Sequence, residues 1–484
     1  MNLKELKNKR ILILSAARNK VLAEGKVLIL GLGKEGIDSY KFFRKIFPKK
    51  ILGLADQLEM KKLRRKIKKV NFHFGKNYLQ SIKKYDVIIK TPGIPWKTIK
   101  PFLKKGQKIT SQTEIFFENC PGKIIGITGT KGKGTTSSLI YQVLKERLKV
   151  HPVKFASQLF NRVNFVGNIG KPPLMLLLKS KPEDIFVYEI SSHQLINLRQ
   201  SPQIAVLLNI FPAHLEYFKN FKEYLKTKEN ITLWQRENDI FIYPKNISLL
   251  IDKLARKTRA EKITFSVKHR RADCYIKNGY IFYRKEKIFK TKDSPLVGDF
   301  NLLNIMPAVI IAKLFGIPAK KIANTIKNFK PLPYRLEFVG NYRGIKFYND
   351  SLATIPEAAI SAIKSFGSKL QTIILGGFNS NLYYKNLARE ILKSKIKNLI
   401  FFPTVGERIW KEIIQNKKQG RGVPNHFFVT NMKEAVKIAF KETERAKTCL
   451  LSPAAPSFGT FRDYKERGDL FKKYVKIYGR KKTL

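Results

Sequence analysis

Gly-Ile-Thr-Gly-Thr-Lys-Gly-Lys, at residues 126–133, follows an apolar start at 124–125 and leads into an amphipathic segment. A strand, a glycine-rich loop and a helix in this order are typical of a phosphate-binding loop. There, backbone N–H groups and the helix N-terminus surround phosphate oxygens while a lysine reaches the terminal phosphates. The spacing departs from the strict Walker form, because Gly134 stands where a Ser or Thr usually binds the metal, so Thr135 or another hydroxyl must do so. The predicted phosphate-binding residues are Gly129, Thr130, Lys131, Gly132, Lys133, Gly134 and Thr135.

A second glycine-rich turn lies nearer the N-terminus. The apolar residues 27–30 run into Gly31-x-Gly33-x-x-Gly36, and Asp56 follows twenty residues after the last glycine. This pattern is the dinucleotide-binding fingerprint, in which glycines let the backbone approach a pyrophosphate and the acid bonds a ribose hydroxyl. Taken alone, the turn indicates an NAD oxidoreductase, or it merely tightens the packing of a helix on a strand.

The alternation of apolar strands and helices starts three times along the chain, near residue 26, at residue 123 and after residues 331–333. A chain of 484 residues also exceeds what one hydrophobic core normally supports. We therefore predict an α/β protein of three domains, at residues 1–118, 119–331 and 332–484. The first and last domains are expected to be Rossmann-like, and the central one to be of the P-loop ATPase type.

The formal net charge of +59 favours polyanionic partners. Lysines occur from end to end without a separate basic arm, and no nucleic-acid recognition module is visible, so we expect no specific nucleic-acid binding. A polyanion-binding P-loop ATPase remains the alternative from another functional class. Its turnover would be stimulated by DNA or RNA and would be indifferent to amino acids.

The sequence also indicates where in the cell the protein is located. No apolar run approaches the ~18 residues of a membrane span. The apolar stretch at 11–17 lacks a cleavage pattern and is interpreted as a strand, so we expect a cytoplasmic protein without membrane insertion. Cys120, Cys274 and Cys449 are too few and too scattered for a disulfide framework or a zinc site.

Further motifs follow the phosphate-binding loop in a fixed order, and together with it they resemble the Mur ligase family, most closely its MurD branch. The resemblance covers nearly the whole chain beyond residue 26, and the N-terminal glycine turn then resembles a UDP-binding domain. The motifs are Gly167-Asn168-Ile169-Gly170, Glu189-Ile190-Ser191-Ser192-His193-Gln194-Leu195, Leu208-Asn209-Ile210-x-x-x-His214-Leu215, Tyr224-x-x-x-Lys228, Gly298-x-x-Asn301-x-x-Asn304, Leu332-Pro333-x-Arg335, Asn349-Asp350-Ser351, Leu375-Gly376-Gly377 and Leu451-Ser452-Pro453-Ala454-Ala455-Pro456-Ser457-Phe458.

The resemblance implies an activity. ATP would phosphorylate the carboxylate of UDP-N-acetylmuramoyl-L-alanine, and glutamate, with the D form favoured, would displace phosphate from the acyl phosphate during peptidoglycan precursor synthesis. A related ligase that adds L-glutamate or another amino acid, including a MurC-like enzyme, is the alternative within the family. Nothing in the sequence fixes the oligomeric state, and we expect a monomer.

The motifs also assign roles to residues. Glu189 follows the apolar residues 185–187, where its carboxylate would face the phosphate-binding loop and hold Mg²⁺. By resemblance, His214 and Lys228 serve a second Mg²⁺, the lysine as a carbamate. Lys133, Glu189, His214 and Lys228 are the predicted catalytic residues, and Thr135, Glu189, His214 and Lys228 the predicted metal ligands. By the same resemblance, Asn301, Arg335 and Asp350 are expected to complete the ATP site. The predicted substrate-binding residues are Gly31, Gly33, Lys34, Glu35, Gly36, Asp56, Gln57, Thr91, Asn168, Thr354, Ser457, Phe458 and Tyr464.

Three positions depart from the family pattern. Leu352 and Ser380 stand where lysines usually contact the transferred phosphate and the side-chain carboxylate of glutamate, and Ala213 rather than Asp precedes His214. A charge-assisted pair contributes roughly 1.5 to 3 kcal/mol, so an acidic amino acid should bind more weakly unless another cation substitutes. Lys385 is a nearby candidate. We therefore expect D-glutamate to be favoured over L-glutamate only modestly.

Overall fold

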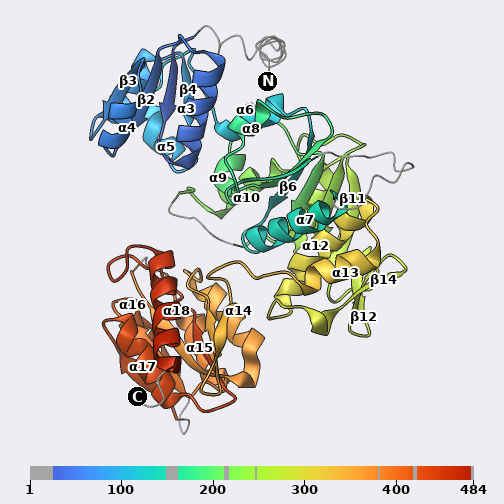
Figure 1. Ribbon diagram of the computed structural model, residues 1–484, viewed down its shortest axis with the longest axis vertical. Coiled ribbons are helices and arrows are strands. Elements are labelled where there is room, and N and C mark those ends of the chain that lie inside the picture. The colour runs from blue at the N-terminus through green and yellow to red at the C-terminus, as the bar shows by residue number, and fades with distance from the viewer. Residues whose placement is uncertain are drawn as a thin grey trace. The chain divides into compact units, whose positions relative to one another are not determined.

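The computed structural model describes residues 25–148, 162–211, 217–245, 248–379, 382–417 and 422–480. The stretch at 11–17 lies outside these ranges. Three sheets with flanking helices confirm the predicted α/β fold (Figure 1). The chain divides into two compact units, one of residues up to Thr291 with Leu303–Ile326 and the other of Lys292–Leu302 with Lys327–Leu484. The second unit thus takes in a short segment ahead of the boundary expected at 331.

The first sheet has five parallel strands in the order β3-β2-β1-β4-β5. Its central strand β1 is apolar throughout and fully buried, as expected of a parallel strand covered on both faces. Helix α3 begins at Lys34, inside the glycine turn. The elements are β1 (Val27–Leu30), α3 (Lys34–Ile46), β2 (Leu52–Asp56), α4 (Lys61–Lys66), β3 (Val70–Phe74), the 3-10 helix η1 (Tyr78–Lys84), β4 (Val87–Lys90), α5 (Trp96–Ile99), the 3-10 helix η2 (Lys100–Phe102) and β5 (Lys108–Thr110).

The central sheet has nine strands in the order β14-β13-β12-β11-β10-β9-β6-β8-β7. Strands β6 to β12 run parallel, and the hairpins to β13 and β14 are antiparallel. The strands are β6 (Lys123–Thr128), β7 (Arg162–Gly167), β8 (Asp184–Glu189), β9 (Ile204–Leu207), β10 (Ile240–Pro244), β11 (Glu261–Ser266), β12 (Cys274–Lys277), β13 (Tyr280–Tyr283) and β14 (Glu286–Lys290). The helices are α7 (Lys133–Leu148), α8 (Leu174–Leu177), α9 (Ser192–Leu195), α10 (Phe221–Glu229), α11 (Leu249–Lys257), η3 (Thr291–Asp293), α12 (Phe300–Leu314) and α13 (Ala319–Lys327).

Helix α6 (Gln112–Asn119) follows the first sheet in the chain but packs on the second. The Phe116 ring lies 5.2 Å from that of Phe186 and 5.6 Å from that of Tyr188, centre to centre, and both partners belong to β8. Thr113 also shares a hydrogen bond with the Tyr188 hydroxyl. Packing therefore joins α6 to the central sheet, ahead of the boundary expected at residue 118.

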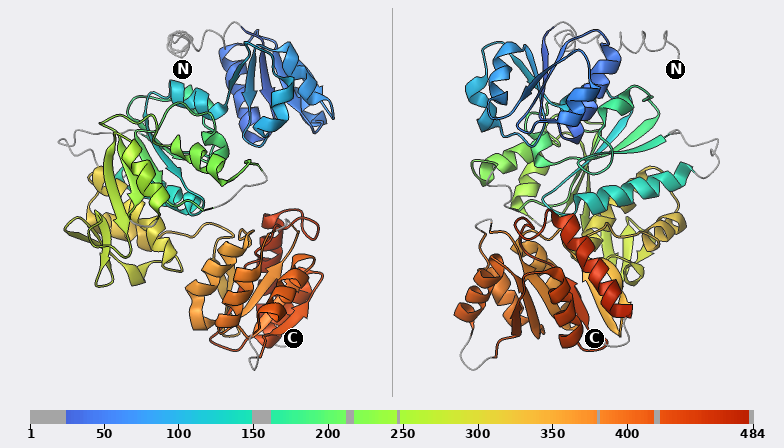
Figure 2. Two further views of the ribbon diagram at one scale, coloured as in Figure 1. Left: turned by 180° about the vertical axis from the view of Figure 1, so that it is seen from behind. Right: turned by 60° about the vertical axis from the view of Figure 1, so that its left-hand side comes forward.

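The last sheet has six strands in the order β15-β16-β20-β17-β18-β19, and only the β15–β16 pair is antiparallel. Helix α18 lies along it (Figure 2). The helix buries Phe471, Val475 and Tyr478 in the same core cluster as residues of the sheet. Among the described residues, no helix has the length and apolar character that crossing a bilayer requires. The elements are β15 (Glu337–Tyr342), β16 (Ile345–Asn349), α14 (Pro356–Phe366), η4 (Gly367–Lys369), β17 (Leu370–Gly376), α15 (Lys385–Lys393), β18 (Asn398–Phe402), α16 (Val405–Asn416), β19 (Asn425–Phe428), α17 (Met432–Glu442), β20 (Thr448–Leu451) and α18 (Tyr464–Arg480).

Candidate active site

The glycine-rich loop at 129–132 joins β6 to α7, with β8 and β9 on either side of β6. Gly132 has φ +84°, which favours glycine, and a Cβ there would lie 2.1 Å from Asn304 Oδ1 and displace that side chain. Asn209 follows β9 by two residues and bonds the loop at Lys131. Its Oδ1 accepts from Lys131 N at 2.9 Å, and its Nδ2 donates to Lys131 O at 3.0 Å. These two hydrogen bonds fix the backbone of the loop at Lys131.

Lys133 is the first residue of α7 and lies over the loop. Its Nζ donates to the carbonyl oxygens of Gly129 at 2.8 Å and Thr130 at 3.2 Å. The Thr130 hydroxyl shares a 2.8 Å hydrogen bond with Tyr224 of α10. The N-terminus of α7 and the lysine together place positive charge where a phosphate chain would lie.

Glu189 ends β8 beside the loop strand, paired in register with Ile127 of β6. Its side chain is 2% exposed, and its Oε1 accepts from Asn168 Nδ2 at 3.2 Å. A buried carboxylate with the buried hydroxyl of Thr135 offers the hard oxygen donors that Mg²⁺ prefers. The described residues contain no group of three or more His, Cys, Asp or Glu side chains arranged around a metal.

Lys228 of α10 is 1% exposed and points at the loop strand. Its Nζ donates to Thr128 Oγ1 at 3.2 Å and lies 5.1 Å from the centre of the Tyr224 ring. Burial, with a smaller effect of the Lys133 charge, lowers the pKa of Lys228 well below its usual value. The structure thus brings Lys133, Glu189 and Lys228 to the loop region, whereas His214 lies outside the described residues.

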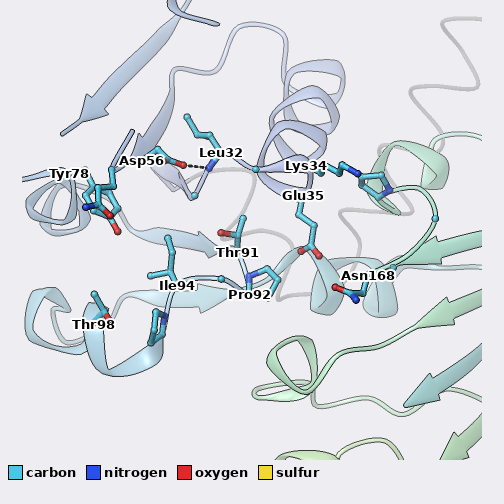
Figure 3. A pocket seen from close by; sticks show the side chains of 18 residues that line it. Leu32, Lys34, Glu35, Asp56, Tyr78, Thr91, Pro92, Ile94, Thr98 and Asn168 are labelled. Carbon is cyan, nitrogen blue, oxygen red and sulfur yellow. Dashed lines mark hydrogen bonds between the residues drawn. The ribbon is translucent and has the colours of Figure 1, made fainter. Parts of the chain in front are cut away.

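A cavity of about 610 Å³ opens at the carboxyl ends of β1, β2 and β4 (Figure 3). In a doubly wound sheet this edge, where the strand order reverses at β1 and β4, is the usual ligand-binding position. Asp56 and Tyr78 lie at one end of the cavity, and Glu35 and Asn168 at the other. Of the predicted substrate-binding residues, those that line it are Gly31, Gly33, Lys34, Glu35, Asp56, Gln57, Thr91 and Asn168.

The glycine turn of this cavity is tightly packed. Gly31 has φ +91°, and a Cβ there would lie 2.0 Å from Thr91 Oγ1. Gly36 does not line the cavity, because it packs α3 on β1, where a Cβ would lie 1.9 Å from Gly31 O. Asp56 supports the turn, since its Oδ2 accepts from Leu32 N at 2.6 Å, as the dashed line in Figure 3 marks. The acid expected to bond a ribose therefore also holds the glycine turn.

Glu35 connects the cavity to the central sheet. Its Oε1 accepts from Nε2 of Gln194 at 2.7 Å, and Gln194 belongs to the motif that begins at Glu189. Burial raises the pKa of Glu35 to about 7, against smaller lowering effects of the Gln194 hydrogen bond and Lys90. Lys90 is itself buried, and its Nζ donates to the carbonyl oxygens of Thr91 and Ile94 in the cavity wall.

In the other unit, Asp350 follows β16, and its carboxylate is held on both sides. Oδ1 accepts from Leu336 N at 3.2 Å, and Oδ2 accepts from Ser452 Oγ at 2.9 Å. Arg335 precedes Leu336 in a turn where Leu336 has φ +42°. Asn301 Nδ2 donates to Val297 O at 2.7 Å. Asp350 and Arg335 thus lie on adjoining segments of this unit.

The predicted amino-acid residues gather around two loops of the same unit. Ser457 is buried, whereas Phe458 is 58% exposed and its ring meets that of Phe378 at 6.3 Å. The Tyr464 carbonyl accepts from Ser351 Oγ at 2.8 Å. Thr354 lies just after the Asp350–Ser351 turn, its N–H donating to Leu352 O. Lys385 is exposed at the start of α15, and Ser380 lies outside the described residues.

Several residues of the site were missed at the level of sequence. Asn209 and Asn304 belong to motifs in the sequence but were assigned no role, although both contact the phosphate-binding loop. Lys90 stood in an apolar strand and gave no signal of its own. Other lining residues of the cavity were not predicted either, among them Tyr78, Pro92, Gly93, Ile94, Pro95 and Thr98.

Comparisons with known proteins find similar sequences and similar structures. The model of the Mur ligase middle domain matches residues 127–312. The UDP-N-acetylmuramoylalanine–D-glutamate ligase of Clostridium tetani is 30% identical over 94% of this chain and 98% of its own length. The Aquifex aeolicus protein of the same name is 33% identical over 81% of this chain and 88% of its own.

Two solved structures share the fold. The UDP-N-acetylmuramate–alanine ligase MurC of Thermotoga maritima aligns with a TM-score of 0.58 at 16% identity, over 94% of this chain and 99% of that one. The MurF ligase of the same organism, crystallised in complex with ADP, aligns with a TM-score of 0.57 at 16% identity, over 94% of this chain and 96% of that one. At this identity the likeness concerns the fold alone.

Proposed function

This chain belongs to the Mur ligase family as a MurD-type, ATP-dependent ligase, and we propose that it joins glutamate to UDP-N-acetylmuramoyl-L-alanine. The observation that carries the proposal is the convergence of three groups on one loop in the central sheet. Lys133 lies over the phosphate-binding loop, Lys228 bonds its strand, and Glu189 ends the neighbouring strand. The relatives that this chain matches over most of its length bear the name of this ligase.

The first chemical step is phosphoryl transfer. A substrate carboxylate oxygen attacks the terminal phosphorus of ATP, the bond to the bridging oxygen breaks, and ADP leaves. The loop N–H groups and Lys133 bind the phosphates and offset the charge that develops on them. Magnesium, when bound, reduces the repulsion between the triphosphate and the attacking carboxylate, and Thr135 and Glu189 would hold it. The role of His214 as a further ligand stays a prediction.

The second step is amide formation. The amine nitrogen of the amino acid attacks the acyl carbon, the carbon–oxygen bond to phosphate breaks, and the nitrogen loses a proton. The sugar-nucleotide substrate would occupy the cavity at the glycine turn, with Asp56 at the ribose. Glu35 and Asn168, at the other end of the cavity, each bond to the motif that begins at Glu189. The reacting carboxylate would therefore lie at that end.

Lys228 is proposed to work as a carbamate. Burial favours its neutral amine, and the amine nitrogen attacks the carbon of CO₂ with loss of one proton. The product carries oxygen atoms of the kind that Mg²⁺ prefers, in place of a cation. A buried lysine whose closest hydrogen-bond partner is the hydroxyl of Thr128 supports this assignment.

The amino acid is proposed to be glutamate, with D favoured over L only modestly. Thr354, Ser457, Phe458 and Tyr464 would surround it, in the unit that also carries Asp350. Leu352 is an apolar residue beside this group, and Lys385 is exposed. L-Glutamate or another amino acid is the alternative. The name of the relatives supports D-glutamate.

The deciding experiment measures phosphate release with ATP and UDP-N-acetylmuramoyl-L-alanine across a panel of D- and L-amino acids. We expect the highest turnover with D-glutamate and measurable turnover with L-glutamate. Strong turnover with L-glutamate and none with D would overturn the stereochemical assignment. Preference for a neutral amino acid would overturn glutamate itself. Turnover stimulated by nucleic acid and indifferent to every amino acid would reject the ligase.

A further inference from the structure

Arg467, in the first turn of α18, is fully buried. Its guanidinium bonds two loops of the last sheet. Nε donates to Ser351 Oγ at 3.1 Å, and Nη2 donates to Ser351 O at 2.9 Å. Nη1 donates to the carbonyl oxygens of Ala455 at 3.1 Å and Pro456 at 3.4 Å.

All of these acceptors are neutral. Among the described residues, no carboxylate lies within ion-pairing distance of Arg467. The nearest acid in sequence to the bonded serine is Asp350, and its carboxylate is held by Leu336 N and Ser452 Oγ instead. Burial lowers the pKa of Arg467 to about 9, so the side chain keeps its charge at neutral pH. A buried charge without an opposite charge is unfavourable for folding, which points to another use for it.

The position of this charge indicates where it acts. Ser351 and the segment at 455–456 follow β16 and β20, which are neighbours in the sheet. A Cβ on Gly377, which follows the next strand β17, would lie 3.2 Å from Arg467 Nη1. The carboxyl ends of adjacent parallel strands form the usual ligand-binding edge of such a sheet. Arg467 therefore lies directly under three loops of that edge.

The parts of these loops next to the strand ends, residues 350–354, 376–379 and 452–459, contain neither Lys nor Arg, and the exposed Arg462 follows only later in the loop after β20. Arg408 of α16 approaches the same edge, bonding the Asn379 side chain and Leu382 O, and it is only partly buried. On the basis of the proposed function, we propose that Arg467 is a specificity-determining residue whose buried charge selects an amino acid with an acidic side chain. It acts without touching the substrate, by holding Ser351 and the 455–456 backbone and by making the potential at this edge positive.

The test compares kcat/KM for glutamate with kcat/KM for glutamine, its neutral counterpart of nearly equal shape, in each variant. This ratio does not depend on the fraction of folded enzyme. Arg467→Met removes the charge and keeps an apolar side chain of similar length, and we expect the ratio to fall about tenfold or more. Arg467→Lys keeps the charge and loses the fork that spans both loops, so kcat should fall while the ratio is largely retained. If Arg467→Met yields no folded protein, Arg467→Gln takes its place with the same expectation.

Two further variants make the result decisive. Arg462→Met removes an exposed arginine five residues away and should leave the ratio unchanged. Arg408→Met removes the partly buried arginine at the same edge. An unchanged ratio in the neutral Arg467 variant that folds, Arg467→Met or Arg467→Gln, overturns the inference, and so does a large fall confined to Arg408→Met. Phosphate release by the wild-type enzyme without any amino acid would contradict the proposed ligase function. A wild-type preference for glutamate that survives the loss of Arg467 would contradict only the role of Arg467.

Discussion

Lys228 in the central domain and Arg467 in the last domain are both cations removed from water, and burial affects them in opposite ways. Lys228 bonds one hydroxyl and lies over one aromatic ring. Arg467 bonds backbone and hydroxyl oxygens of two loops. Burial lowers the pKa of the lysine and so favours its neutral amine, whereas the arginine keeps its proton at neutral pH and is a fixed charge. The residue type therefore decides whether a desolvated cation supplies chemistry or electrostatic potential.

Exchanging the two residue types should reduce activity most at Lys228. Lys228→Arg introduces a permanent buried cation that cannot become a carbamate, so phosphate release should fall about 10²-fold or more, as it should for Lys228→Ala. Short carboxylates such as acetate should restore part of the activity of Lys228→Ala, because a carboxylate replaces the carbamate oxygens. They should not restore Lys228→Arg, whose side chain fills the space. Substantial activity in Lys228→Arg would refute the carbamate.

The neighbours of Lys228 provide the next test. Lys133→Ala removes the positive group over the phosphate-binding loop, and Glu189→Ala removes the buried carboxylate of β8. Each should lower turnover about 10²-fold, as loss of one preorganised charge-stabilising group usually does. Steady-state phosphate release at varied ATP and Mg²⁺ measures both, with Lys262→Ala on β11 as an exposed lysine control. Near wild-type turnover in either site variant would remove that residue from the catalytic site.

Glu35 is a buried acid, in contrast to the two buried cations, and we expect the smallest effect here, on stability. Burial raises its pKa to about 7 from 4.5, so the folded chain holds a proton there that the unfolded chain releases. Its contribution to stability is thus fully present below about pH 4.5 and is lost as pH rises through about 7. Glu35→Gln should therefore raise the unfolding midpoint relative to wild type at pH 8 by roughly 2–4 °C per kcal/mol recovered. At pH 5 the two proteins should unfold together.

Calorimetry at the two pH values makes this measurement, with Glu183→Gln as an exposed control. A midpoint difference that is equal at pH 5 and pH 8 would contradict a protonated Glu35. So would a destabilised Glu35→Gln at pH 8, because that result would show that the carboxylate form makes the stronger bond to Gln194.

The features predicted from sequence are those that local pattern determines. Both glycine turns, the buried strands around them and the three-sheet α/β fold were visible because the spacing of glycines and apolar residues reflects backbone geometry. Arg467 was not visible, because it stands among Lys465, Glu466 and Asp469 and resembles a residue on a solvated helix face. Only tertiary packing buries it. The same holds for Asn209, whose partner Lys131 comes from a distant segment.

Helix α6 has a consequence for dividing the protein into fragments. Its Phe116 covers Phe186 and Tyr188 on the central sheet, although the chain enters it directly from the first sheet. A fragment of the central domain that begins after residue 119 would leave these rings facing water and should aggregate. One that begins near Ser111, whose hydroxyl caps α6 by accepting from Glu114 N, keeps the aromatic cluster covered. The boundary at which the first domain can be removed or exchanged therefore lies before α6, near Ser111.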